Sequence, residues 1–433
     1  MDVKHIKAGF TRRQNFIRIR MEEFVLLIVQ KFGGSSVANT ERIFNVANRI
    51  IETYNKGNDV VVVLSAQGDT TDELIEKAGE IDQNPSKREM DMLLSTGEQQ
   101  SVALMAMAIK KLGYQAISLN AAQAGISTTS HYSNAKIKTI SRGRIERELG
   151  RKNIVIVTGF QGVNKFDDIT TLGRGGSDTS AVALAAALHA DLCEIYTDVD
   201  GVYTADPRIV KNARKLTEIS HDEMVELASL GAKVLHNRSV EVAKKYNVSL
   251  VVRSSLTREE GTVIKEECNV EKMLVSGVAS DKDVSRISVV GINDEPGKAF
   301  EIFRLMDKEN ISVDIIIQSI GRGKTKDISF TVAKNDMQAA VDILEKNKER
   351  LGAKEIVHDD KIAKLSIVGA GMATNSGVAS IMFEALYDAG VNISMISTSE
   401  IKISVLIEEK DVERAMIAVH DKFNLAESGL RKS

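Results

Sequence analysis

The second half of the chain contains an internal repeat. The segment RISVVG at Arg286–Gly291 resembles KLSIVG at Lys364–Gly369, and each leads into a helix that begins after a glycine, Gly297 or Gly377. In each copy the pattern then predicts two further strands and a second helix, the strands being Ile311–Ile317 and Ile328–Val332 in the first copy and Val391–Ile396 and Ile401–Ile407 in the second. Units with this βαββαβ order fold into a small antiparallel sheet with helices on one face. A sequence that repeats in this way is expected to fold into repeated structural units. We therefore predict two α+β domains, at about 285–350 and 362–425.

Short apolar runs alternate with helical patterns through the first half of the chain. Helices are predicted from about Thr40, over Arg88–Lys110 and over Ala181–Leu188. All-apolar strands between amphipathic helices are typical of a mostly parallel sheet covered on both faces. The first half is therefore predicted to be α/β. The apolar runs predicted as strands are Val25–Val29, Val60–Leu64, Ile154–Val157, Cys193–Tyr196 and Ser249–Val252.

These patterns divide the chain into three parts. Residues 1–22 are a basic extension, and the apolar run after them is predicted to be a core strand rather than a signal peptide, because no small-residue cleavage site follows. Residues 23–262 form the α/β domain, and residues 274–433 contain the repeat. An additional strand, Leu274–Val278, precedes only the first copy, which is compatible with one unit being inserted in the other.

Composition excludes several classes of protein. The 433 residues include 57 basic and 60 acidic ones, a net charge of −3 that predicts no nucleic-acid or membrane surface. No apolar run reaches the roughly 18 residues of a membrane span. Two separated cysteines, Cys193 and Cys268, exclude a disulfide framework and have no Cys or His neighbours for a metal site. Two thiols without a disulfide framework are typical of a cytoplasmic protein.

A glycine pair follows the first predicted strand, in KFGGSS at Lys31–Ser36. Gly33 and Gly34 allow the backbone to approach a ligand closely. The N-terminus of the next helix offers free N–H groups to an anion, and Lys31 adds a full positive charge. The combination indicates a phosphate site, although a glycine pair after a strand is also common in ordinary turns.

The segment TLGRGGSD at Thr171–Asp178 precedes an alanine-rich helix. Arg174 lies among three glycines, which leaves its guanidinium accessible, and the planar guanidinium matches a carboxylate with two hydrogen bonds. A structural alternative is that Ser177 or Asp178 caps the helix. That alternative explains Asp178 but not the position of Arg174.

Two more motifs follow further along the chain. TDVDGVYTADPR at Thr197–Arg208 comes after a predicted strand, at the carboxyl edge where open α/β sheets bind ligands. Its Asp-Gly and Asp-Pro pairs are also ordinary turn signals. GAKVLH at Gly231–His236 supplies Lys233 as a second candidate cation, with a solvated surface lysine as the alternative.

Together and in this order, the four motifs resemble the amino-acid-kinase superfamily, and its aspartokinase branch in particular. The repeat is similar to the tandem ACT domains of that branch, including ISVD at Ile311–Asp314 and STSEIKIS at Ser397–Ser404. The resemblance extends from Val25 to Leu425. It implies a three-layer sandwich with a mostly parallel central sheet, followed by two ferredoxin-like ACT domains. It also implies transfer of the γ-phosphate of ATP to the β-carboxylate of L-aspartate, giving 4-phospho-L-aspartate on the pathway to lysine, threonine and methionine.

The resemblance implies a role for particular residues. Lys31, Asp178 and Lys233 correspond to the catalytic set, with Asp178 orienting the lysines. Arg174 corresponds to the residue that holds an aspartate carboxylate, and Glu98 to the one that takes the ammonium. The other implied substrate contacts are Gly33, Gly34, Ser65, Thr71, Phe160 and Ser177. The implied ATP contacts are Lys31, Gly33, Gly34, Thr197, Asp198, Tyr203, Arg208 and Lys233.

This chemistry needs no catalytic base, because the nucleophile is a carboxylate that is already ionised at neutral pH. The enzyme has to position two anions and neutralise charge on the transferred phosphoryl group. The expected cofactor is Mg²⁺ held mainly by the ATP phosphates, without a dedicated protein metal site.

The resemblance also implies regulation by an amino acid bound at the ACT domains, with lysine expected first and threonine second. The corresponding effector contacts are Ala299, Ser312, Val313, Asp314 and Gln318. Asp314 has an alternative as a surface residue at a strand end. ACT pairs join across subunits in this branch, so a homodimer or a dimer of dimers is expected.

Two other functions remain open from the sequence. One is another kinase of the same superfamily, acting on a different carboxylate or phosphate. The other is an amino-acid sensor whose kinase domain is inactive. The presence of Lys31, Arg174, Asp178 and Lys233 argues against the sensor, because an inactive site does not require these charges.

Overall fold

The computed structural model describes residues 25–231, 234–266, 274–319, 321, 323, 325–373, 375 and 377–426. The basic extension, Lys233 and Cys268 lie outside these ranges. The chain divides into two compact units, Met1–Asp198 with Lys245–Glu259, and Val199–Lys244 with Glu260–Ser433. No helix among the described residues is both long enough and apolar enough to cross a membrane.

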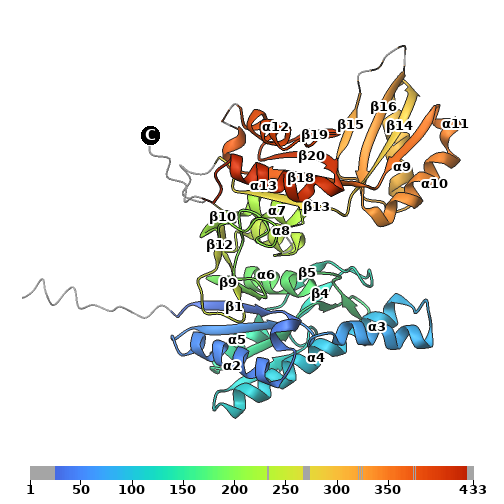
Figure 1. Cartoon of the computed structure of the whole chain (residues 1–433). Helices are drawn as coiled ribbons and strands as arrows, with labels where there is room; N and C mark the ends of the chain where they lie inside the picture. Colours follow the sequence, from blue (N-terminus) through green and yellow to red (C-terminus); the bar gives the residue numbers. More distant parts are fainter. Residues whose placement is uncertain are drawn as a thin grey trace, which may run out of the picture. The chain divides into compact units, whose positions relative to one another are not determined.

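A parallel sheet forms the centre of the first unit, in the order β11-β9-β1-β2-β6-β3 (Figure 1). Strands β2 and β6 are apolar except at one end because both of their faces are covered. This confirms the predicted α/β class. The strands are β1 (Leu27–Phe32), β2 (Asp59–Leu64), β3 (Ala116–Leu119), β6 (Ile154–Thr158), β9 (Leu192–Thr197) and β11 (Leu250–Ser254).

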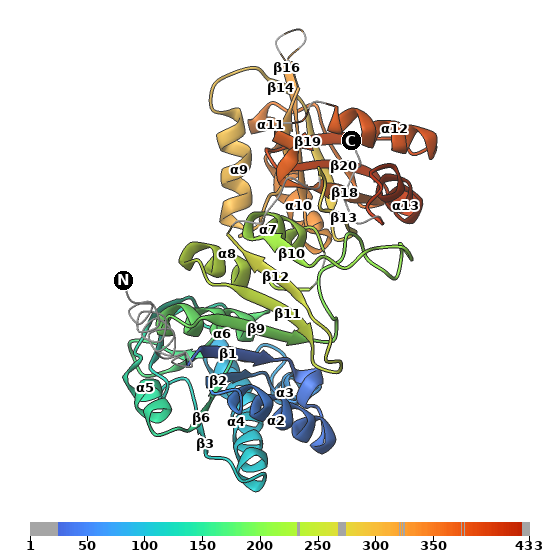
Figure 2. The same ribbon diagram turned by 90° about the vertical axis from the view of Figure 1, so that its left-hand side faces the viewer.

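Helices cover both faces of this sheet and so make three layers. Helices α2 (Thr40–Tyr54) and α4 (Lys87–Lys111) pack on the face that carries Phe32, Val60 and Ile156. Helix α6 (Gly176–Leu188) contacts β1, β2 and β9 from the opposite face, as Figures 1 and 2 show. Side chains of a strand alternate between faces, so neighbouring residues of β1 point to different layers.

A second, small sheet in the first unit was not predicted from the sequence. Its strands run in the order β5-β4-β7-β8 and are three or four residues long. Polar contacts such as Thr128 Oγ1 to Thr170 Oγ1 (2.6 Å) hold it together, so it lacks an apolar pattern. Helices α3 and α5 were also missed. These elements are α3 (Thr70–Ile81), β4 (Ile126–Thr128), β5 (Ile137–Ile140), α5 (Gly143–Gly150), β7 (Gln161–Val163) and β8 (Ile169–Thr171).

The second unit begins with the elements that follow β9. Strand β10 (Glu218–Ser220) pairs in parallel with β12 (Thr262–Lys265). Helix α7 (His221–Ser229) starts at a capping box, in which Ser220 and Glu223 satisfy each other's backbone N–H groups. Helix α8 (Asn237–Tyr246) follows.

The repeat forms two four-stranded sheets in the orders β15-β16-β14-β17 and β13-β18-β20-β19. Strand β13 precedes the first copy but pairs with β18 of the second, so the first copy lies between two strands of one sheet. The strands are β13 (Gly277–Asp281), β14 (Ser285–Asn293), β15 (Ile316–Gln318), β16 (Thr325–Val332), β17 (Glu355–Asp359), β18 (Ile362–Val368), β19 (Met395–Thr398) and β20 (Lys402–Glu408). The helices are α9 (Lys298–Lys308), α10 (Met337–Lys346), α11 (Lys348–Leu351), α12 (Val378–Asp388) and α13 (Val412–Lys422).

Several predicted boundaries were wrong. Strand β1 ends at Phe32, not Val29, because its pairing with β2 and β9 continues through Lys31 and Phe32. Helix α6 begins at Gly176, before the predicted Ala181, because Gly175 adopts a left-handed conformation at the N-cap. In the predicted strand Ile311–Ile317 only the end is extended, as β15, and β13 begins three residues after the predicted Leu274.

Candidate active site

An ion pair joins the first strand to the helix after the arginine loop. Lys31 lies on β1, on the face opposite Phe32, and Asp178 lies in the first turn of α6. The Lys31 Nζ to Asp178 Oδ1 distance is 2.6 Å, and the two side chains are 11% and 14% exposed. The N-cap of α6 is Gly175, and no side chain caps this end. The interpretation of Asp178 or Ser177 as the helix cap is therefore wrong, and Asp178 instead forms an ion pair with Lys31.

The glycine pair lies directly beside Lys31. A Cβ atom on Gly34 would be 2.5 Å from the carbonyl oxygen of Ala66, so only glycine fits there. A Cβ on Gly33 would be 3.5 Å from Lys31 Nζ. The chain then makes a short 3-10 turn, Gly34–Val37, before α2 begins. This geometry leaves backbone close to a lysine ammonium, which suits a phosphate.

Glu98 is a buried carboxylate with an unsatisfied oxygen. It lies on α4 and is 3% exposed. Oε1 accepts a hydrogen bond from the Ala66 N–H (3.2 Å), whereas Oε2 has no partner among the described residues. Burial raises the pKa of Glu98 from 4.5 to about 7. A buried charge of this kind requires a cation, so the position suits a ligand ammonium.

Two other predicted substrate residues lie at the two ends of the loop that contains Ala66. Ser65 follows β2 and donates its backbone N–H to the carbonyl of Phe32 (3.2 Å). Thr71 lies in the first turn of α3, at the other end of the loop, and both residues are half-buried. The absence of a side chain on Gly97 lets α4 approach this loop, because a Cβ there would be 2.8 Å from Ala66 Cβ.

Phe160 and Ser177 lie where the end of β6 meets the start of α6. Phe160 has a φ of 65°, which is unusual for a bulky residue and often accompanies a functional site. The Ser180 hydroxyl accepts the Phe160 N–H (3.1 Å) and holds this conformation. A Cβ on Gly159 would be 2.6 Å from Ser177 Oγ, so the two segments are in close contact.

Arg174 is exposed between two glycines with positive φ, Gly173 at 79° and Gly175 at 66°. In the part of the chain that the structure describes, no side chain or carbonyl pairs with its guanidinium. Lys31 thus lies near the carboxyl end of β1, and the carboxyl ends of β2 and β6 lead into the segments that carry Ser65 and Phe160. Helix α6 adds Asp178 and Ser177. This is the edge at which open α/β sheets bind ligands.

Sequence reasoning missed Asp91, which holds the arginine loop. Asp91 is fully buried on α4 and accepts hydrogen bonds from Thr171 N (2.8 Å), Thr171 Oγ1 (2.7 Å) and Ser133 N (2.8 Å). Thr171 is two residues before Gly173. Asp91 precedes Glu98 by two helical turns and so lies on the same face of α4. The sequence signal that could have identified Asp91 is a carboxylate two helical turns before Glu98.

The predicted nucleotide residues fall in different parts of the structure. Thr197 ends β9 and donates its hydroxyl to Asp198 (2.9 Å) in the first unit. In the second unit, Tyr203 donates its hydroxyl to Asp200 (3.0 Å), and Arg208 Nη2 lies 2.7 Å from Asp206 Oδ2. Arg208 lowers the pKa of Asp206.

The predicted effector residues surround the loop between α9 and β15. Asp314 is exposed, as the alternative of a surface residue would have it, and it also pairs with Lys364 of β18 (Oδ2 to Nζ, 2.5 Å). Lys364 is 6% exposed. Val313 and Ala299 pack against the core of the first ACT copy. Ser312 and Gln318 are exposed.

Comparisons with known proteins agree with this arrangement. The amino acid kinase family matches residues 27–254, and the ACT domain family matches residues 287–347 and 365–423. The aspartokinase of Bacillus sp. (strain MGA3) is 52% identical over 406 residues, which cover 94% of this chain and 99% of the relative. The aspartokinase of Geobacillus stearothermophilus is 53% identical over 402 residues, covering 93% and 98%.

Solved structures show the same similarity. The aspartate kinase of Clostridium acetobutylicum is 25% identical with a TM-score of 0.73, covering 92% of this chain and 100% of that one. E. coli aspartokinase III in complex with lysine and aspartate is 25% identical with a TM-score of 0.72, covering 93% and 100%. With about half of its residues shared with full-length relatives, this chain belongs to the aspartokinase family and is a kinase that transfers a phosphate group to aspartate.

Proposed function

We propose that the enzyme transfers the γ-phosphate of ATP to the β-carboxylate of L-aspartate and forms 4-phospho-L-aspartate, the first step toward lysine, threonine and methionine. The observation that carries the substrate assignment is Glu98, whose buried carboxylate has an oxygen without a partner in the described chain. The ammonium of aspartate would compensate that charge. Arg174, exposed in its glycine loop, would bind a substrate carboxylate.

The remaining predicted substrate residues would orient the substrate between these two charges. Ser65 and Thr71 flank the loop whose Ala66 N–H donates to Glu98, and Phe160 and Ser177 lie where the end of β6 meets the start of α6. A site that pairs both an ammonium and a carboxylate rejects analogues that lack either group, because a buried charge is then left unpaired.

Phosphoryl transfer in this site depends on positive charge rather than on a base. Lys31, held by Asp178, and Lys233 would neutralise charge on the γ-phosphate, with Gly33 and Gly34 allowing the backbone to approach it. Mg²⁺ bound mainly by the nucleotide phosphates would supply further charge neutralisation. Within the described residues no group of three or more His, Cys, Asp or Glu side chains could hold a metal ion. The nucleotide contacts are proposed to include Thr197, Asp198, Tyr203 and Arg208.

The test is ATP- and aspartate-dependent formation of an acyl phosphate, trapped with hydroxylamine. We expect product with L-aspartate, and little with succinate, which lacks the ammonium that Glu98 would bind. Equal rates with succinate and aspartate would contradict the role of Glu98. No product with aspartate from a folded, nucleotide-binding protein would refute the substrate assignment.

We further propose feedback inhibition by lysine, or by threonine, through Ala299, Ser312, Val313, Asp314 and Gln318. Support comes from the ion pair of Asp314 with Lys364, since an effector ammonium could take the place of the Lys364 ammonium. It also comes from the lysine named in the E. coli aspartokinase III complex. The same trapping assay with each amino acid, alone and combined, tests this proposal. Product formation insensitive to both would refute it.

The assembly and the organisation of the chain are also proposals. A homodimer or a dimer of dimers through the ACT domains is supported by the exposed apolar edge residues Ile316 on β15 and Ile396 on β19. Light scattering at several concentrations tests it, and a monomer throughout would contradict it. Residues 23–262 would be the catalytic domain and 274–433 the regulatory region. A cytoplasmic location is proposed because ATP and aspartate are available there.

A further inference from the structure

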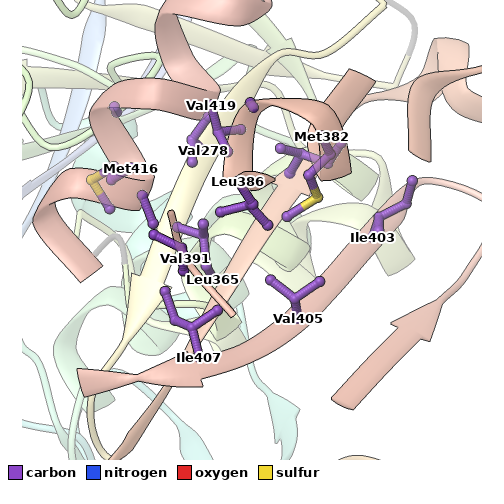
Figure 3. Close-up of a cluster of buried hydrophobic side chains, with 14 of the residues drawn as sticks. Val278, Leu365, Met382, Leu386, Val391, Ile403, Val405, Ile407, Met416 and Val419 are labelled. Carbon is purple, nitrogen blue, oxygen red and sulfur yellow. The ribbon is translucent and has the colours of Figure 1, made fainter. Parts of the chain in front are cut away.

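The segment that follows β9 is part of the hydrophobic core of the second ACT copy. Ala205 and Val210 are 4% and 1% exposed and cluster with β13, β18 and α13. Figure 3 shows the centre of this cluster, including Val278 of β13 and Val419 of α13. The segment also carries Tyr203 and Arg208. Its conformation is therefore determined partly by packing against the regulatory region.

A buried polar contact joins the same two parts. Thr204 and His420 are both fully buried, and Thr204 Oγ1 lies 3.0 Å from His420 Nε2. His420 lies on α13, 216 residues along the chain from Thr204. The backbone of Thr204 is held as well, because its carbonyl accepts the N–H of Val278 (2.8 Å). Thr204 directly follows Tyr203 in the chain, so this contact holds the backbone next to Tyr203.

The surroundings of His420 favour a neutral ring with its proton on Nδ1 rather than on Nε2. The Arg214 N–H donates to Thr204 Oγ1 (2.9 Å), so the hydroxyl proton is available for His420 Nε2. In the neutral tautomer with its proton on Nδ1, the ring accepts this hydroxyl proton at Nε2. Burial lowers the pKa of His420 and favours the neutral form. Asp421 Oδ1, 3.7 Å from Nδ1, favours a proton at that nitrogen.

We propose that His420 is a positioning residue for nucleotide binding, which acts through Thr204 to hold the segment that carries Tyr203 and Arg208. This inference rests on the proposed nucleotide contacts of those two residues. A buried hydroxyl without its partner lets the segment rearrange toward water. The second ACT copy would thereby contribute to ATP affinity without touching ATP.

The test uses the full-length enzyme and measures KM for ATP and for aspartate separately. His420→Leu keeps the bulk of the side chain but removes the acceptor, and it is expected to raise the KM for ATP about threefold to tenfold. The KM for aspartate should not change. His420→Gln places an amide oxygen near the position of Nε2 and should restore most of the ATP affinity. Thr204→Val should raise the KM for ATP as much as His420→Leu does. The double variant should have a KM for ATP no higher than that of either single variant.

Val419→Ala is the matched control for destabilisation of the same helix and core. Val419 is fully buried beside His420, and its apolar side chain makes no hydrogen bond to the 199–208 segment. This variant should lower the melting temperature without a rise in the KM for ATP. An equal rise in Val419→Ala and His420→Leu would overturn the proposal, because the effect would then be general destabilisation. So would an unchanged KM for ATP in His420→Leu.

Arg208→Ala separates this inference from the function on which it rests. If Arg208→Ala raises the KM for ATP but His420→Leu does not, the positioning role alone is overturned. If Arg208→Ala also leaves the KM for ATP unchanged, the proposed nucleotide role of the segment is refuted, and the role of His420 with it. A rise in both variants, with the KM for aspartate unchanged, supports the inference.

Discussion

Replacing Glu98 with glutamine should make the ligand-free enzyme more stable and less active. Glu98 is buried, its Oε1 accepts a hydrogen bond from the Ala66 N–H (3.2 Å), and burial raises its pKa from 4.5 to about 7. One pKa unit corresponds to about 1.4 kcal/mol, so the ionised carboxylate destabilises the fold by about 3 kcal/mol above pH 7. The pKa of Glu98 is higher in the folded state than in the unfolded state, so the folded state binds the proton more tightly. The resulting stabilisation is fully present below pH 4.5 and is lost as pH rises through about 7.

Glutamine carries no charge, and its amide oxygen can still accept the Ala66 N–H. Its NH₂ group would lack a hydrogen-bond partner, which reduces the gain in the free energy of unfolding by about 1 kcal/mol. We therefore expect Glu98→Gln to be about 2 kcal/mol more stable than the wild type at pH 8 and to show little difference at pH 5. In the trapping assay the KM for aspartate should rise roughly 100-fold, because the ammonium loses its charged partner.

Thermal unfolding without substrates, at both pH values, measures the difference. Glu148→Gln is the control, because Glu148 is equally buried but pairs with Arg144 (3.0 Å) and Arg151 (3.3 Å). That variant should be less stable than the wild type at pH 8. A Glu98→Gln variant that melts no higher than the wild type at pH 8 would refute the reasoning, since the charge of Glu98 would then be compensated without a ligand.

Three further substitutions test the rest of the site. Asp178→Asn removes the charge that orients Lys31, and kcat should fall roughly 100-fold; unchanged turnover would refute the orienting role. Asp91→Asn presents an NH₂ group to the donors of the arginine loop, so the KM for aspartate should rise about tenfold with the KM for ATP unaffected; equal changes in both would indicate a general loss of structure. Gly34→Ala forces a Cβ to within 2.5 Å of a carbonyl oxygen, so the glycine loop must shift and activity should fall at least roughly tenfold; a fully active variant would contradict the close approach.

Regular patterns made much of the fold predictable. The strands β2 and β6 are continuous apolar runs, and such runs between amphipathic helices arise only where both faces of a strand are covered. The repeat predicted two similar sheets for the same reason, since each copy has one apolar face to bury. The strands β4, β5, β7 and β8 were not predictable in this way. They are short and partly polar, and the side-chain bond between Thr128 and Thr170 is invisible until the strands are paired.

The candidate site was predictable where a residue type is itself unusual. A lysine next to an apolar run and an arginine among glycines are unusual arrangements, so the sequence singled out Lys31 and Arg174 as candidates. Asp91 and Asp200 could not, because a single aspartate has many ordinary roles. Only the structure shows that Asp91 holds Thr171, and that Asp200 pairs with Lys215 (3.1 Å) and accepts from Tyr203.

The sequence by itself determined the fold class, the two ACT copies and the chemical character of the site, because these depend on local periodicity and on residue type. Tertiary structure alone decided which charges meet. It placed Asp178 on Lys31, left one oxygen of Glu98 without a partner in the described chain, and brought His420 to Thr204. Contacts between residues so far apart in the chain depend on how the sheets and helices pack, and no local pattern encodes that packing.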